Sequence, residues 1–402
     1  MLLVNKDIQP DLLFRYKTEL AEELTAILSY WMRHTIHRSG GFYGSVNNSN
    51  IPDEAAVKGV VLNSRILWTF SAAYQVTKNL NHYKTAQRAY DYILGYFVDK
   101  EYGGVYWAVD ANGNMRDGRK QIYGLAFCIY GLAEYYKISN EQQSLDTAID
   151  LYNCIELYSF DKTKNGYIEA FTREWVTISD LRLSEKDKNE RKTMNTHLHI
   201  LEAYANLYSI WPDAGLKEKT SNLLFLFDRY FVNSANHHLN LFFDDDWQLK
   251  SSLQSYGHDI EAAWLLLQCA EIIEEEKWID QFRQYAVPVT EAAAEGLDAD
   301  GGLWYEYEPG NDQLIQEKHS WPQAEAMIGF YNAYQLTGKE KYLQMSLRSW
   351  EFVKKHIKDK ENGEWFWGVN GDYTIMQKEK TGFWKCPYHN SRACIELVKC
   401  IN

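Results

Sequence analysis

The stretch at positions 40–44, which reads "GGFYG", decides the fold because similar stretches return along the chain. The related stretches are "GGVYW" at 103, "NGYIEAF" at 165, "DGGLWYEY" at 300 and "NGEWFWGV" at 362. Steps of 63, 62, 136 and 61 residues separate the marker glycines, which are Gly41, Gly104, Gly166, Gly302 and Gly363. The step of 136 is two steps of 68, and "HHLNLFFDDD" at 237–246 keeps aromatic residues near the missing position without a glycine. This period predicts six repeats in the 402 residues, each of about 67 residues.

Apolar residues recur every three or four positions between these stretches, which is the periodicity of a helix. About twelve helices are expected, at 11–36, 58–78, 82–98, 119–138, 142–158, 193–211, 215–232, 257–275, 277–296, 318–337, 339–358 and 388–401. The even-numbered helices are apolar almost all round, as in "IYGLAFCIYGLAEYY" at 122–136, whereas several odd-numbered ones alternate with charged residues. We therefore expect an all-α fold, an (α/α)6 barrel with six inner helices inside six outer helices. Short β-hairpin elements are expected in its long loops.

The loop lengths predict which end of the barrel carries function. Loops that leave an inner helix are short, such as "NLN" after 78 and "TGK" after 336. Loops that lead into an inner helix are much longer and contain the glycine stretches, so they gather at one face, and long loops are commonly functional. We expect the glycines to turn the chain sharply and the aromatic residues after them to form a rim around one mouth. The alternative is that many of these aromatic residues form a second core beneath the loops.

Charge and cysteine content restrict the class of protein. The net charge of -13, from 42 basic and 55 acidic residues, argues against nucleic acid or an anionic membrane as a partner. The six cysteines lack CxxC spacing, so a reducing cytoplasm is the expected compartment. The start "MLLVNKDIQP" lacks the basic and apolar regions of a signal peptide, and no apolar run approaches the ~20 residues that span a bilayer. No linker interrupts the repeats, so residues 1–402 are expected to form one catalytic domain.

Polar and aromatic side chains lie in the first two turns of the expected inner helices, where they would face the mouth. They are Arg65, Tyr123, Asn195, His199, His258, Glu261, Trp321, Glu325 and His389. Spacings of three or four residues place Asn195 and His199 on one helix face, and His258 and Glu261 on another. Three histidines, one arginine, two glutamates and aromatic rings should therefore converge on one cavity.

This set of side chains suits proton transfer at carbon. The dipole of a helix disfavours a cation near its N-terminus, which helps to keep a histidine there neutral and basic near pH 7. Two imidazoles on opposite sides of a bound molecule can remove a proton from one face and return one to the other. Arg65 can donate to the enediolate oxygen that develops when a C–H next to a carbonyl loses its proton. The pattern indicates isomerisation or epimerisation.

Other interpretations of the histidines stay open at this point. A single histidine on an apolar helix is often a hydrogen-bonded core residue, and a cluster of histidine and glutamate can bind a metal. The "HLH" at 197–199 places its imidazoles on different helix faces and no HExxH occurs, so no metal is expected. The following histidines are expected at the surface: His34, His37, His82, His237, His238 and His356. No phosphate-binding glycine loop and no nucleophile elbow is recognisable.

Four segments resemble a known family. They are "GVVLNSRILW" at 59–68, "TMNTHLHILEAY" at 193–204, "SYGHDIEAAWL" at 255–265 and "WKCPYHNSRAC" at 384–394. They are similar to cellobiose 2-epimerases, within the N-acylglucosamine 2-epimerase superfamily, and the resemblance extends from about residue 15 to the C-terminus. It implies an (α/α)6 barrel and epimerisation at C2 of the reducing-end sugar of a β-1,4-linked disaccharide. The implied route passes through ring opening and a cis-enediolate and needs no cofactor.

The resemblance also implies catalytic roles. His389 would take the C2 proton, and His258 would assist ring opening and deliver a proton from the opposite face. Arg65 and His199 would hold the O1 and O2 oxygens of the enediolate. Glu261 resembles the family carboxylate that orients and charges a catalytic histidine.

The expected substrate-binding residues are Tyr123, Asn195, Asp187, Trp321, Trp384 and Glu325. Trp321 and Trp384 would sandwich the reducing-end ring and the sugar attached at its O4. Asp187 lies in the charged run "SEKDKNERK" at 184–192, which by itself reads as a solvated loop. The resemblance replaces that interpretation with a contact to substrate hydroxyls. N-acetylglucosamine epimerases carry a smaller, glycine-rich segment before the final histidine and respond to ATP, whereas "WKCPYHN" is similar to the disaccharide-using branch.

Three other functions remain alternatives. An inverting glycoside hydrolase would use two carboxylates across the scissile bond, and Glu261, Glu325 and Asp259 are candidates. An aldose–ketose isomerase would protonate the same enediolate at C1 and form a ketose. A non-catalytic barrel would bind a sugar or a protein at its aromatic mouth. The sequence leaves open whether the substrate is cellobiose, lactose or β-1,4-mannobiose, and whether the chain is a monomer or a homodimer.

Overall fold

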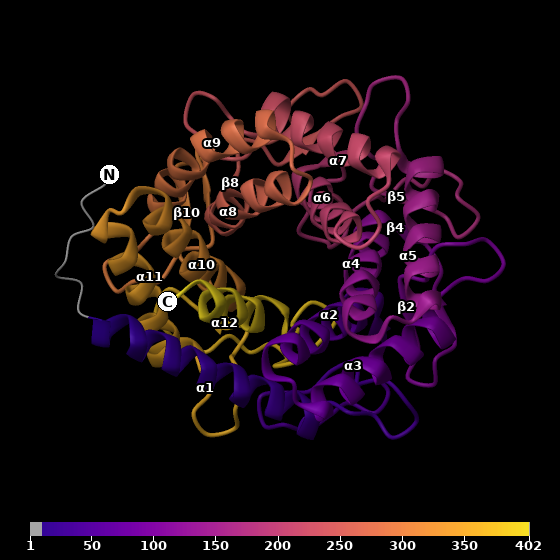
Figure 1. Cartoon of the computed structure of the whole chain (residues 1–402), viewed down its shortest axis with the longest axis horizontal. Coiled ribbons are helices and arrows are strands. Elements are labelled where there is room, and N and C mark those ends of the chain that lie inside the picture. Colours follow the sequence, from indigo (N-terminus) through magenta and orange to yellow (C-terminus); the bar gives the residue numbers. More distant parts are fainter. Residues whose placement is uncertain (1–9, 402) are drawn as a thin grey trace.

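The computed structural model describes residues 10–401, and its helices form two concentric rings (Figure 1). The first nine residues, where no signal peptide is expected, and residue 402 lie outside the described part. The inner ring consists of α2 (Val60–Thr77), α4 (Ile122–Ser139), α6 (Met194–Tyr208), α8 (Tyr256–Ile272), α10 (Ser320–Thr337) and α12 (Tyr388–Cys400). The outer ring consists of α1 (Pro10–His34), α3 (Leu80–Tyr92), α5 (Gln142–Cys154), α7 (Ala214–Leu226), α9 (Glu276–Ala294) and α11 (Glu340–Phe352). The expected (α/α)6 barrel is confirmed for the described residues.

Burial separates the two rings as the sequence patterns predict. In α4 every residue from 122 to 135 is buried, because outer helices, neighbouring inner helices and the barrel interior surround it. The outer helix α3 buries one face, which includes Ala86, Ala89 and Tyr90, and leaves the other face to solvent. A helix that is apolar all round needs neighbours on every side, whereas an amphipathic helix needs them on one.

Four outer helices end in a single wider turn of π-helix. These turns are Ile93–Phe97 after α3, Ile155–Ser159 after α5, Phe227–Phe231 after α7 and Val353–Ile357 after α11. Glycine stretches after the outer helices reverse the chain: Gly41 after α1 and Gly104 after α3 have φ angles of +59° and +70°, in the left-handed region that favours glycine. The expected sharp turns are therefore present. Apolar periodicity predicts the helices but does not distinguish their final π turn from an α-helical one.

A two-residue strand precedes five of the inner helices and pairs with a strand of the following repeat. The antiparallel pairs are β1 (Lys58–Gly59) with β2 (Ala108–Val109), β4 (Lys120–Gln121) with β5 (Ala170–Phe171), β6 (Lys192–Thr193) with β7 (Phe242–Phe243), β8 (Gln254–Ser255) with β9 (Glu306–Glu308), and β11 (Lys318–His319) with β12 (Gly368–Val369). Two more strands, β3 (Met115–Asp117) and β10 (Gln313–Ile315), extend the first and fourth pairs. Each pairing ties the start of an inner helix to the next long loop, so the loops fix the first turns around one mouth.

Buried lysines also hold the starts of three inner helices, each to the beginning of its own loop. Lys120 pairs with Asp99 at 2.8 Å, with both side chains inaccessible to solvent, and Lys192 pairs with Asp161 at 3.1 Å. Lys318 occupies the same place before α10 and pairs with two aspartates. Lysine is rarely buried unless it is paired, so each of these side chains is held by its carboxylate. The sequence analysis did not identify this repeated pair, because its two members are separated by a whole loop.

The ring closes where the first and last helices meet. α1 packs against α12, and Lys17 of α1 donates to the carbonyl of Ile401 at 2.6 Å. α12 also packs against α2, so closure brings His389 of the last helix beside Arg65 of the first inner helix. None of the described helices is long and apolar enough to cross a membrane.

The aromatic residues of the glycine stretches divide between the mouth and the core. Tyr305 and Trp367 line the cavity at the mouth, as a rim would. Phe42 and Tyr167 are fully buried beneath the loops, as a second core would require. Both expectations are therefore correct for part of the set.

Candidate active site

A cavity of about 730 Å³ opens at the mouth formed by the long loops. Ten of the eleven expected site residues line it: Arg65, Tyr123, Asp187, Asn195, His199, His258, Glu261, Trp321, Trp384 and His389. They come from all six inner helices and from two loops, although up to 324 residues separate them in sequence. The convergence of these side chains on one cavity is thus present in the structure. The eleventh residue, Glu325, is not among the residues that line the cavity.

His258 lies in the first turn of α8, and its Nδ1 is 2.9 Å from the hydroxyl oxygen of Ser255. A serine hydroxyl can donate or accept, so this contact permits either neutral tautomer of the imidazole. Burial lowers the pKa of His258 to about 4, and the Glu261 carboxylate opposes that shift. The imidazole is therefore neutral near pH 7.

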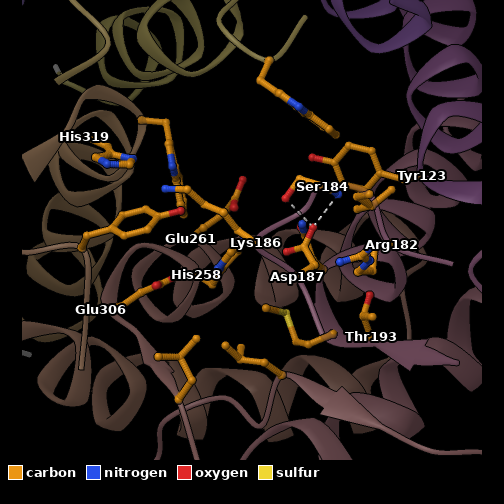
Figure 2. A pocket seen from close by; sticks show the side chains of 18 of the residues that line it. Tyr123, Arg182, Ser184, Lys186, Asp187, Thr193, His258, Glu261, Glu306 and His319 are labelled. Atoms are coloured by element: carbon orange, nitrogen blue, oxygen red, sulfur yellow. Dashed lines mark hydrogen bonds between the residues drawn. The ribbon is translucent and has the colours of Figure 1, made fainter. Parts of the chain in front are cut away.

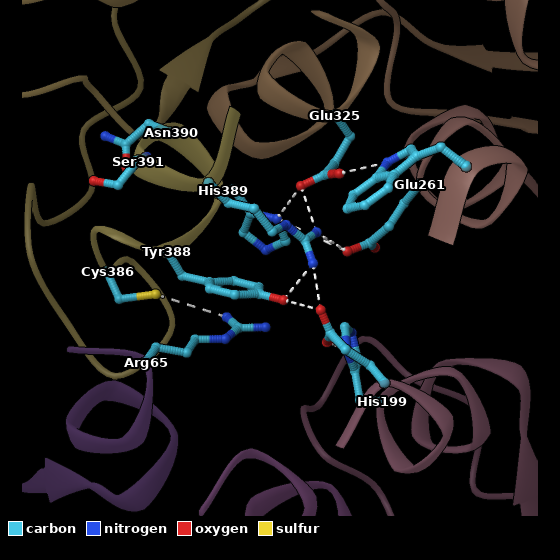
Figure 3. Close-up of polar contacts among 12 residues, drawn as sticks. Arg65, His199, Glu261, Glu325, Cys386, Tyr388, His389, Asn390 and Ser391 are labelled. Atoms are coloured by element: carbon cyan, nitrogen blue, oxygen red, sulfur yellow. Dashed lines mark hydrogen bonds and ion pairs between the residues drawn. The ribbon is translucent and has the colours of Figure 1, made fainter. Parts of the chain in front are cut away.

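His389 lies in the first turn of α12, and its Nδ1 is 2.7 Å from Oε1 of Glu325 (Figure 3). An ionised carboxylate only accepts hydrogen bonds, so Nδ1 carries the proton and Nε2 keeps a free lone pair. Burial holds the pKa of His389 well below its ordinary value. His389 is therefore oriented as a neutral base. Glu325 stands behind this imidazole, which differs from the direct contact with substrate expected for it.

The indole of Trp321 lies close to both of these imidazoles. Its ring centroid is 4.9 Å from that of His258 and 5.5 Å from that of His389. Gly257 leaves room for it, since a Cβ at that position would lie 2.5 Å from the indole. A flat aromatic face with two nitrogen bases close to it can hold the apolar face of a sugar ring and leave its C–H bonds within reach of both.

Arg65 and His199 supply donors on another side of the cavity. Nη2 of Arg65 donates to the hydroxyl of Tyr123 at 2.8 Å, and its guanidinium lies 4.1 Å from the ring centroid of Phe127. Nδ1 of His199 is 3.0 Å from Oε2 of Glu202, which fixes the orientation of that imidazole. A permanently charged guanidinium and an oriented imidazole are suited to stabilise a developing oxyanion.

Two charged residues beneath the cavity, Glu202 and Arg392, were missed in the sequence analysis. Both are almost completely buried, and Arg392 donates to Glu202 and also to Glu261 and Glu325. A sequence signal exists: each is a charged residue in an apolar inner helix. Each also follows a site histidine by three residues, so it lies on nearly the same helix face.

The carboxylates proposed for a hydrolase are not arranged across a substrate. Asp259 lies outside the cavity lining, where it accepts from Nδ1 of His238 at 2.7 Å and from the backbone of Leu239 at 2.8 Å. Glu325 is engaged by His389 and also lies outside the lining. Two opposed carboxylates of the kind that glycoside hydrolysis requires are therefore not formed by these residues.

A group of possible metal ligands is already paired with a positively charged side chain, that of Arg392. Glu261, Glu325 and His389 offer ligand atoms within 4.8 Å of one another. Nη2 of Arg392 donates to both carboxylates, at 2.7 Å to Glu325. A metal ion there would stand against a guanidinium, so this donor set does not favour one.

Three of the six histidines expected at the surface are buried, so the prediction is wrong for His37, His82 and His238. Nδ1 of His82 is 2.8 Å from the hydroxyl of Thr77, and His238 is paired with a buried aspartate. The ring of His37 packs edge-on against an aromatic neighbour. Imidazoles that satisfy their polar atoms locally can be buried in loops and outer helices, and sequence position alone does not reveal this.

Polar side chains of the loops line the outer part of the cavity (Figure 2). The backbone and hydroxyl of Ser184 both donate to Oδ2 of Asp187 at 2.8 Å. Burial raises the pKa of Glu306 to about 7, and His319 stands on the same side of the cavity. The reading of 184–192 as a merely solvated loop is wrong, because several of its side chains line the cavity.

Comparison with known proteins agrees with this geometry. The family model described as N-acylglucosamine 2-epimerase (GlcNAc 2-epimerase) matches residues 41–393. A cellobiose 2-epimerase of Bacteroides fragilis is 46% identical over 385 residues, which cover 95% of this chain and 98% of that protein. A cellobiose 2-epimerase of Dictyoglomus turgidum is 38% identical over 387 residues, with the same two shares covered. The solved structure of cellobiose 2-epimerase from Bacillus thermoamylovorans superposes with a TM-score of 0.91 at 39% identity, covering 96% of this chain and 99% of that one. The chain belongs to the N-acylglucosamine 2-epimerase family.

Proposed function

We propose that the protein epimerises C2 of the reducing-end sugar of a β-1,4-linked disaccharide, converting cellobiose to glucosyl-mannose and lactose to epilactose. The observation that carries this proposal is that two partly buried, neutral imidazoles, His258 and His389, both line the cavity beside the Trp321 indole. Reversal at one carbon needs a base on one face and an acid on the other. The names of the similar proteins supply the substrate class.

The reaction begins with ring opening, which exposes an aldehyde at C1 and makes the C2 proton acidic. His258 assists this step at the ring and O1 oxygens. The free Nε2 of His389 then removes the C2 proton, and the imidazolium that forms is stabilised by Glu325. The negative charge moves to the O1 and O2 oxygens of a cis-enediolate, where Arg65 and His199 stabilise it.

Rotation about C2–C3 turns the other face of the enediolate toward His258. His258 delivers a proton acquired from solvent to C2, and the proton held by His389 returns to solvent. The hydroxyl of Ser255 can accept from Nδ1–H or donate to Nδ1, so it can follow both protonation states of His258. No redox step is involved, because one proton leaves C2 and one proton returns.

We place the second sugar of the disaccharide, the one attached at O4, in the outer part of the cavity. Trp384 lines the cavity near Tyr123, at a ring-centroid distance of 6.0 Å, and can stack on a sugar face. Oδ2 of Asp187 already accepts from Ser184, and its carboxylate can accept further hydrogen bonds from sugar hydroxyls. Cys386 lines the cavity as a thiol, with its Sγ 3.8 Å from Nη1 of Arg65. Because a thiol persists in a reducing compartment, we place the reaction in the cytoplasm.

Product analysis tests the proposal. The protein is incubated with cellobiose, lactose and β-1,4-mannobiose, and the products are separated by chromatography and identified by NMR. We expect the C2 epimer of at least one sugar. Release of monosaccharide would indicate a hydrolase, a ketose as the main product would indicate an aldose–ketose isomerase, and binding without turnover would indicate a non-catalytic barrel.

A further inference from the structure

We propose that Arg392 is a positioning residue that holds the carboxylates behind the catalytic imidazoles and keeps His389 unprotonated at rest. This inference rests on the proposed function and extends it to a residue that does not line the cavity. Arg392 is 1% exposed and lies one turn below His389 on α12.

The contacts of Arg392 join four inner helices. Its Nη1 donates to Glu202 of α6, and its Nη2 donates to Glu261 of α8 and, at 2.7 Å, to Glu325 of α10. The hydroxyl of Tyr388 contacts both Arg392 and Glu202. One planar guanidinium therefore sets the relative positions of three carboxylates.

Two of these carboxylates hold site histidines. Glu325 is the partner of Nδ1 of His389, and Glu202 is the partner of Nδ1 of His199. Glu261 lies 4.0 Å from Nδ1 of His389. The proposed base and the proposed oxyanion donor are thus both oriented by groups that share Arg392.

The charges of the cluster explain why a cation is needed there. The guanidinium of Arg392 meets three carboxylates, those of Glu202, Glu261 and Glu325, so it compensates their negative charge only in part. Further negative charge is compensated when His389 takes a proton during the reaction. Without Arg392, the excess of negative charge would favour the imidazolium form of His389 and raise its pKa, and an imidazolium cannot act as a base.

Stability alone does not account for this cluster. Removing charged groups from water has a large desolvation cost, and apolar residues of similar volume often stabilise a core at least as well. The rings of Trp264 and Tyr388 already lie 5.0 and 4.3 Å from the guanidinium carbon, so the site could accommodate an apolar side chain. Among residues 10–401, the polar contacts of the Arg392 guanidinium are made by Nη1 and Nη2, to the three carboxylates and Tyr388, and Nε–H has no acceptor there.

Three variants separate the charge of Arg392 from its geometry. Arg392→Met removes both, Arg392→Lys keeps the charge but cannot bridge three carboxylates, and the double variant Arg392→Met/Glu261→Gln removes one positive and one negative charge together. Lys380→Met is the matched control, because Lys380 is fully buried and paired with Asp359 but lies outside the cavity lining. The measurements are kcat, KM and the pH profile of kcat/KM with cellobiose, after circular dichroism has verified the fold.

We expect Arg392→Met to move the acidic limb of the profile upward by about 1 pH unit or more, because the guanidinium lowers the pKa of His389. The double variant should return the limb toward its wild-type position. Arg392→Lys should keep the limb but lower kcat by about 10²-fold with KM little changed, since the base is misplaced. Lys380→Met should change neither kcat nor the limb.

The inference is overturned if the folded Arg392→Met variant has the wild-type limb and kcat, or if Lys380→Met shifts the limb equally. If Arg392→Met does not fold, wild-type kcat in Arg392→Lys overturns the inference and a lowered kcat with an unchanged limb supports it. Absence of epimerisation by the wild-type protein would instead contradict the proposed function, and the inference would fall with it.

Discussion

Different hydrogen-bond partners give the two central imidazoles different properties. Glu325 only accepts, so it fixes one tautomer of His389, whereas Ser255 can donate or accept and leaves His258 free to change state. A residue that assists ring opening and also delivers a proton needs that freedom. A residue that removes one proton benefits from a fixed orientation.

Removal of either imidazole should stop the reaction. We expect His389→Ala and His258→Ala each to lower kcat by about 10²–10⁴-fold, the usual contribution of a positioned acid or base. The affinity for cellobiose, measured by calorimetry, should change only slightly, because other residues of the cavity remain. His34→Ala is the control, since this histidine ends the outer helix α1, and it should retain full activity. A variant at 258 or 389 with wild-type kcat would remove that residue from the mechanism.

The pH profile should reflect burial of the two histidines. A base works above its pKa, and burial lowers the pKa of His258 to about 4 and that of His389 well below its ordinary value. The acidic limb of kcat/KM should therefore lie below pH 6.5, with activity kept as the pH falls past that value. Far-ultraviolet circular dichroism at each pH separates acid unfolding from titration. An acidic limb at or above pH 6.5 would contradict the assignment of these imidazoles as neutral bases at rest.

Prediction of individual residues from sequence succeeds where a helix start determines the direction of a side chain. Arg65, Asn195 and His389 were identified because the first turns of the inner helices must face the mouth. Arg392 was not identified, because its role depends on carboxylates from three other helices, and a pattern along one helix does not contain them. The orientation of Glu325 toward His389 depends on tertiary packing in the same way.

At the scale of elements, the glycine stretches form the turns that position the inner helices. Gly41 has a φ of +59°, and a Cβ on it would lie 2.6 Å from the ring of Tyr92 at the end of α3. The turn and its packing therefore both exclude a side chain. The buried pair of Lys120 and Asp99 then attaches the next loop to the start of α4.

Two glycine substitutions near the end of α3 should have opposite effects. Gly41→Ala should destabilise the protein by about 2 kcal/mol or more, from the left-handed backbone and the contact with Tyr92. Gly95→Ala should be neutral or stabilise it by about 0.5–1 kcal/mol, because Gly95 is helical and exposed and no atom of the described part of the chain lies within 4 Å of its Cβ position. Urea denaturation of both variants measures the free energies of unfolding. Equal effects would show that the turn does not require glycine at position 41.

Element positions were predicted well because periodicity and repeats are local properties. The strand pairs were not, since each joins segments from two repeats. The lysine–aspartate pairs were not either, since their members lie at the two ends of one long loop, as Asp161 and Lys192 do. In the fourth repeat the turn forms without a glycine. His237 there adopts a φ of +63°, and His238 beside it pairs with the buried Asp259 of α8.

At the scale of the whole molecule, the sixfold repeat determines both the barrel and the location of the site. All long loops gather at one mouth, and all six inner helices contribute side chains to the cavity there. Closure of the ring places α12 beside α2, which brings His389 to the same cavity as Arg65. The period of the sequence was sufficient to predict this architecture, since inner helices that are apolar almost all round need neighbours on every side.

The central claim is that a proton leaves C2 toward one imidazole and a solvent proton returns from the other. The most direct test is to incubate the protein with cellobiose in deuterium oxide and to examine the product by proton and carbon NMR. The account predicts glucosyl-mannose that carries deuterium at C2 of its reducing-end sugar. An epimer with no deuterium at C2 would contradict the account, because the hydrogen would then have been transferred without exchange.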